Sequence, residues 1–155
     1  MAQSFKIKFD PVSSGSGYIH IEAYDQKAGI STSNFFDPHF DLIHWIEGIV
    51  DGKEESLIEI DEEGHIKIMI VNQKPNDPLV HLVVKDYDFP EEADSKEYIS
   101  AFIEKDVLIR DFLTNFEAFL KTGLRSKEWY SYGEKEPDLI SPLKAVEAKY
   151  IKLRA

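Results

Sequence analysis

Four short apolar segments between residues 57 and 103 restrict the fold of this chain more than any other feature. They span residues 57–60, 65–71, 79–84 and 98–103. The connections between them are turns, apart from an acidic stretch that contains Pro90 and is typical of a loop. Parallel neighbours need a crossover of about a dozen residues or more, usually a helix. The pattern therefore predicts an antiparallel meander.

The N-terminal part predicts a hairpin followed by a helix. Residues 5–9 and 18–24 alternate apolar and polar side chains, as half-buried strands do. We expect these two segments to pair, and residues 30–35 to add a short third strand. Asp37 and Pro38 then open a helix, because aspartate suits the N-cap and proline suits the first helical position.

Two further helices are expected after the meander. The first runs from Asp106 to about Thr122, and its apolar stripe includes Phe112 and Phe116, which we expect to be buried. Ser141 opens the second. The predicted order is ββ-α-ββββ-α-α, an α+β fold with an antiparallel sheet of about six strands and helices packed on one face. Residues 1–155 contain no linker, so we expect a single domain.

The charge and the composition limit the partners. With 18 Lys and Arg against 29 Asp and Glu, the net charge is −11. Such a field repels phosphate backbones, so we expect no nucleic-acid binding, but it speeds encounter with a basic protein. The chain has no cysteine, which fits a cytoplasmic protein. It shows neither a signal peptide nor an apolar run long enough to span a membrane, so we expect no membrane association.

Two patterns resemble metal sites but are explained better as solvated surface. Asp37, Asp41 and His44 have the spacing of one helix face, yet zinc sites usually need three convergent ligands including His or Cys. Residues 86–97 can be aligned with a calcium loop, but Glu91 stands where the sharp turn requires glycine. We therefore expect no metal and no cofactor.

An enzymatic site would have to be assembled from scattered residues. The sequence contains no nucleophile elbow, phosphate loop or dinucleotide fingerprint. His20, His65 and His81 each fall in a predicted strand, and they converge only if those strands are neighbours that share a face. An enzyme with a dispersed site at Asp41, His44, His20 and His81 remains an alternative.

The aromatic segment Trp129, Tyr130 and Tyr132 has two interpretations. Large aromatic side chains dominate binding hot spots, so it could anchor a partner, or it could fold back as a lid over the end of the sheet or over the last helix. The leading hypothesis is a non-catalytic protein-binding module of the inhibitor or immunity type. It would contact a basic partner through these aromatics and through Glu91 and Glu92. A structural subunit that pairs with another copy through a sheet edge or the last helix is a further alternative.

Overall fold

The computed structural model describes residues 4–87, 96–125, 129 and 137–154. Within these residues the strands are β1 (Phe5–Phe9), β2 (Ser16–Ala23), β3 (Gln26–Ser33), β4 (Glu55–Asp61), β5 (Ile66–Asn72), β6 (Leu79–Asp86) and β7 (Glu97–Glu104), and the helices are α1 (His39–Val50), α2 (Lys105–Lys121) and α3 (Ile140–Arg154). The element order confirms the predicted α+β class and the meander.

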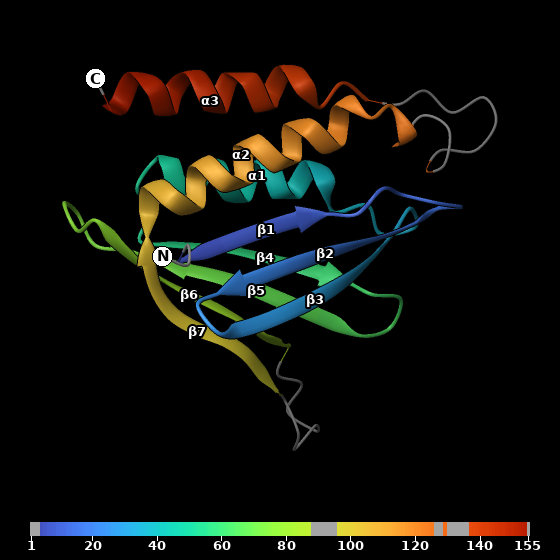
Figure 1. The fold of residues 1–155 in the computed structure, drawn as a ribbon, viewed down its shortest axis with the longest axis horizontal. Coiled ribbons are helices and arrows are strands. Elements are labelled where there is room, and N and C mark those ends of the chain that lie inside the picture. The colour runs from blue at the N-terminus through green and yellow to red at the C-terminus, as the bar shows by residue number, and fades with distance from the viewer. Residues whose placement is uncertain (1–3, 88–95, 126–128, 130–136, 155) are drawn as a thin grey trace.

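The strands form two antiparallel sheets rather than one. The first has the order β1-β2-β3 and the second the order β4-β5-β6-β7. The sheet of β1–β3 lies across the sheet of β4–β7, and the three helices gather along one side of both (Figure 1). The helix α1 lies in the chain between the strands of the first sheet and those of the second.

The strand β3 is longer than the sequence suggests. It pairs with β2 from Gln26 onward, where residues 30–35 alone had been expected. The reason is the tight turn at Tyr24 and Asp25, in which Tyr24 has a φ of 56°. A positive φ is unusual for an aromatic residue, so the sequence gives no signal for this turn.

The helices bury the faces predicted for them. Phe112 and Phe116 are both fully buried, and the ring of Phe9 lies 5.8 Å and 5.0 Å from theirs. At the start of α1, the Asp37 carboxylate accepts a hydrogen bond of 3.0 Å from the His39 N–H. The predicted cap is wrong by one residue: Pro38 is the N-cap and has no side-chain capping bond, His39 is the first helical residue, and Asp37 bonds to its N–H from the turn before the helix.

Side chains from other elements are hydrogen bonded to the outer edges of both sheets. On β1, the Ile7 N–H donates to Asp111 at 2.7 Å, and its carbonyl accepts from Asn115 at 2.8 Å. On β7, Gln26 accepts from the Ser100 N–H at 2.7 Å and donates to the Ser100 carbonyl at 3.2 Å. These contacts occupy backbone groups that another strand would otherwise use.

Candidate functional site

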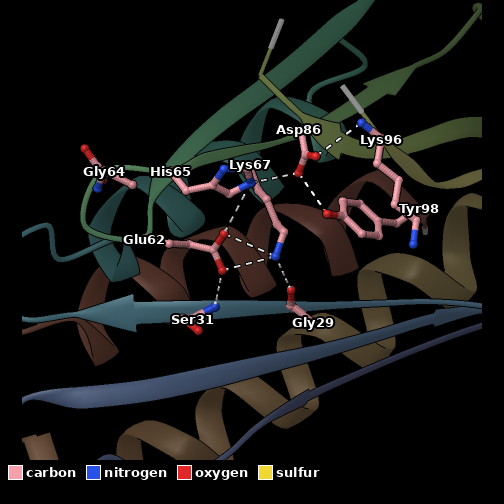
Figure 2. A network of polar contacts seen from close by, with 10 residues as sticks. Gly29, Ser31, Glu62, Gly64, His65, Lys67, Asp86, Lys96 and Tyr98 are labelled. Atoms are coloured by element: carbon pink, nitrogen blue, oxygen red, sulfur yellow. Dashed lines mark hydrogen bonds and ion pairs between the residues drawn. The ribbon is translucent and has the colours of Figure 1, made fainter. Parts of the chain in front are cut away.

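A polar network joins the two sheets where they cross (Figure 2). The Glu62 carboxylate accepts a hydrogen bond of 2.7 Å from the Ser31 N–H on the outer edge of β3. The Lys67 ammonium donates to the Gly29 carbonyl on the same edge at 2.8 Å and forms a 3.1 Å ion pair with Glu62. The network therefore closes the edge of β3 and fixes the two sheets against each other.

The same network contains the most connected carboxylate of the second sheet. Asp86 accepts hydrogen bonds from His65, from the Lys96 N–H and from the Tyr98 hydroxyl (Figure 2). Burial alone would raise the pKa of Asp86, but these hydrogen bonds outweigh it and hold the pKa below its usual value. Burial and the bond to Asp86 raise the pKa of Tyr98 to about 12. The Asp86 carboxylate and the Tyr98 hydroxyl are thus occupied by hydrogen bonds within the protein, which indicates a structural role.

The histidines considered for a dispersed site have separate partners. His20 contacts Asp10 at 2.8 Å, His65 contacts Asp86 at 2.9 Å, and His81 contacts Ser100 at 2.9 Å. Within the described ranges, no group of three His, Asp or Glu side chains is arranged to hold a metal ion. In the calcium-loop alignment only the two ends can be placed, because residues 88–95 lie outside the described residues.

Trp129 is buried and does not present its side chain to a partner. It is 1% exposed, and its ring lies 4.8 Å from that of His39 and 5.7 Å from the Arg125 guanidinium. Its burial corresponds to the lid alternative and not to a surface anchor. The other residues proposed for partner contact, Tyr130, Tyr132, Glu91 and Glu92, lie outside the described residues, and their role stays a prediction.

Three phenylalanines are exposed instead where β3 leads into α1: Phe35 and Phe36 on the connection and Phe40 in the first turn of the helix. Phe35 is 82% exposed, Phe36 48% and Phe40 51%. We call residues 33–40 the aromatic loop. Sequence reasoning missed it, although a signal was present. Phe35 and Phe36 are adjacent and stand between Asn34 and Asp37, two residues typical of a turn, so they did not belong to an alternating strand.

Hydrogen bonds at its N-terminal end hold the aromatic loop in place. The Phe35 N–H donates to the Ser33 hydroxyl at 3.1 Å, and the Phe36 N–H donates to the Ser33 carbonyl at 3.2 Å. The Ser33 hydroxyl in turn donates to Glu63 at 2.7 Å. The Asn34 side chain donates to the carbonyl of Trp129 at 2.8 Å. The backbone that carries Phe35 and Phe36 is therefore fixed by contacts from distant parts of the chain.

A buried ion pair holds the other end of the loop. Arg125 is 1% exposed, and its guanidinium donates to both carboxylate oxygens of Asp37, at 3.0 Å and 3.3 Å. It also contacts the His39 ring. Burial opposes ionisation of Asp37, but the hydrogen bonds from His39 and Arg125 outweigh it and lower its pKa. Asp37 therefore does not share a helix face with Asp41 and His44, because it precedes α1 and turns toward Arg125.

Beside the aromatic loop, a surface hollow of about 340 Å³ lies between α1 and β4. Asp41 and His44 line it from α1, and Glu55 and Leu57 line it from β4. The rings of Phe40 and His44 pack in a T-shaped arrangement, with ring centres 4.7 Å apart. The hollow thus brings together the Asp41 and His44 pair expected from the sequence, but not His20 or His81.

Comparisons with known proteins do not assign a family. No protein-family model matches the chain, and no curated protein matches it. Among solved structures, it is similar to that of the plant transcriptional regulator PBF-2, with 14% identity, a TM-score of 0.36 and coverage of 92% of this chain and 87% of the other. Agreement of this size carries no functional argument. No helix in the described part of the chain is long and apolar enough to cross a membrane.

Proposed function

We propose that this chain is a non-catalytic binding protein that acts by direct contact with a basic partner protein, and that the aromatic loop is the centre of the contact surface. The observation that carries the proposal is the 82% exposure of Phe35 on a backbone fixed at both ends. The hypothesis of an inhibitor or immunity-type protein is kept, but its contact surface is now proposed at Phe35, Phe36 and Phe40 instead of at Trp129.

Exposed aromatic rings on a fixed backbone are well suited to protein recognition. Each can bury a large apolar area, and a backbone that is already held by hydrogen bonds loses less conformational entropy on binding. Hot spots of protein interfaces are few and are enriched in large side chains that fill pockets of the partner. Three such rings within six residues of chain, two of them adjacent, would supply an apolar centre for an interface.

The charges near the aromatic loop support a basic partner. Asp41 and Glu55 line the adjacent hollow, and Glu63 is bonded to Ser33 of the loop itself. Lys53 is the cation in that hollow. A net charge of −11 adds a long-range field that attracts a positively charged protein and orients the encounter.

Co-purification tests the proposal. The tagged chain is recovered from its native cell, and retained proteins are compared for wild type, Phe35→Ala and Phe102→Ala. Phe102 is 63% exposed on β7, outside the loop, and serves as a control of the same residue type. We expect a basic protein to be retained by wild type and by Phe102→Ala and to be lost with Phe35→Ala. Equal retention by all three chains, or no retained protein at all, contradicts the proposal.

A further inference from the structure

The edge of β4 differs from the other three sheet edges. Side chains are hydrogen bonded to the outward backbone groups of β1, β3 and β7. Within the described part of the chain, no side chain is hydrogen bonded to the backbone of β4, whose one strand partner is β5. An edge without such contacts is a template for another strand.

The register identifies which groups of β4 face outward. The Gln73 N–H donates to the Glu54 carbonyl, which makes this facing pair a hydrogen-bonded one. Hydrogen-bonded and non-hydrogen-bonded pairs alternate along antiparallel strands. In the register that pairs Ser56 with Val71, the N–H and C=O groups of Leu57 and of its neighbours two residues away therefore point away from β5. Those residues, Glu55, Leu57 and Glu59, are all exposed.

The open edge borders the hollow beside the aromatic loop. Residues 55–58 of β4 line this hollow together with Asp41, His44 and Trp45 of α1. An extended segment laid along β4 would have one row of side chains facing Asp41 and His44. Its other row would lie beside Glu55, Leu57 and Glu59, because side chains alternate between the faces of a strand.

We propose that a basic, extended segment of the partner adds as a strand to β4. This rests on the proposed function and specifies how the partner is recognised. Backbone hydrogen bonds to Leu57 and Glu59 would supply affinity, and arginine or lysine opposite Glu55 and Glu59 would supply specificity. A second copy of this chain is disfavoured as the occupant, because antiparallel self-pairing about Leu57 places Glu55 opposite the same-charged Glu59.

The probe is a synthetic seven-residue peptide in which arginine and valine alternate, with both ends blocked. Binding is measured by calorimetry, and the contact is located by amide hydrogen exchange. We expect the outward amides of Leu57 and Glu59 to exchange quickly in the free protein and slowly with peptide. The same peptide with every backbone amide N-methylated, and one with glutamate in place of arginine, should not bind.

A proline at residue 57 tests the strand pairing directly. Leu57→Pro removes an outward N–H, which an edge strand tolerates, and Leu57→Ala is the matched control that keeps this donor. We expect Leu57→Pro to bind the peptide about three- to tenfold more weakly than Leu57→Ala, the effect of one lost hydrogen bond. Equal binding by the two variants, protection confined to other strands, or no binding at millimolar peptide overturns strand addition.

Retention of the partner by these variants distinguishes strand addition from the proposed function. Loss of the partner with Leu57→Pro but not with Leu57→Ala supports strand addition. A partner that is retained by Leu57→Pro and lost with Phe35→Ala overturns strand addition and leaves the binding function standing. If the peptide protects the Leu57 amide but the chain retains no partner from the cell, strand addition to β4 is supported and the proposed binding function is contradicted.

Discussion

Replacing Arg125 by methionine should destabilise the protein and release one end of the aromatic loop. Methionine keeps much of the side-chain volume but removes both hydrogen bonds to Asp37, at 3.0 Å and 3.3 Å, and the contact with His39. Arg125 is 1% exposed, whereas a quarter of the Asp37 side chain reaches solvent. Water can therefore take over part, but not all, of the interaction that Asp37 loses.

The magnitude follows from these contacts. Removing one partner of a buried ion pair costs about 3–5 kcal/mol when the other charge is left without any partner; Asp37 keeps the hydrogen bond from the His39 N–H. The partial exposure of Asp37 places the expected loss near the lower limit, at about 3 kcal/mol. Asp37→Asn leaves an amide oxygen that can still accept from Arg125. In the double variant residue 37 is uncharged, so the absence of Arg125 costs less there. The stability lost by the double variant should therefore be smaller than the sum of the losses in the two single variants.

Urea unfolding of the four chains in this double-mutant cycle measures the coupling energy between Arg125 and Asp37. Hydrogen exchange at the Phe35 and Phe36 amides reports separately on the loop, and both amides should exchange faster in Arg125→Met. A stability loss below about 1 kcal/mol, or additive single variants, would refute the claim that this pair holds the loop.

Three further outcomes follow from the structure. Phe116→Ala should lower the free energy of unfolding by about 3–5 kcal/mol in chemical denaturation, because the ring is fully buried in the core, and a loss under about 1 kcal/mol would contradict that packing. The pKa of Asp86 is lowered in the folded state, so its contribution to stability is present above the unfolded pKa of about 4 and is lost as the pH falls through the folded pKa. Thermal melts should therefore show an acid-induced loss that is smaller in Asp86→Asn, and parallel pH profiles would argue against it. Association with a basic partner should slow as salt rises, while dissociation changes little, and charge reversal at Glu91 and Glu92 should also slow association in stopped-flow mixing. A rate constant of association that is independent of salt would remove the electrostatic part of the proposal.

Local patterns predicted the elements of this fold, but not how its strands divide between sheets. Alternation and turn residues located most strands, and the stripe with Phe112 and Phe116 located α2. The division into two sheets depends on contacts such as that of Lys67 with Gly29, 38 residues apart, which no local pattern encodes. The turn at Tyr24 was not predicted from the sequence, because its positive φ is stabilised by the structure around it rather than by residue type.

The candidate site illustrates the same limit, since the sequence alone could not show which aromatic residues are exposed. Trp129 and Phe35 both stand in polar, turn-like surroundings, yet one is buried and the other exposed. Leaving a phenylalanine side chain in water forgoes about 2 kcal/mol relative to burying it. The loop keeps Phe35 outside because Asn34 and Asp37, on either side of the two phenylalanines, are bonded to Trp129 and Arg125, about 90 residues along the chain. Burial of Trp129 and exposure of Phe35 are thus two consequences of one set of long-range contacts. The aromatic residue that local patterns point to is therefore buried, whereas the residues that we propose bind the partner are exposed.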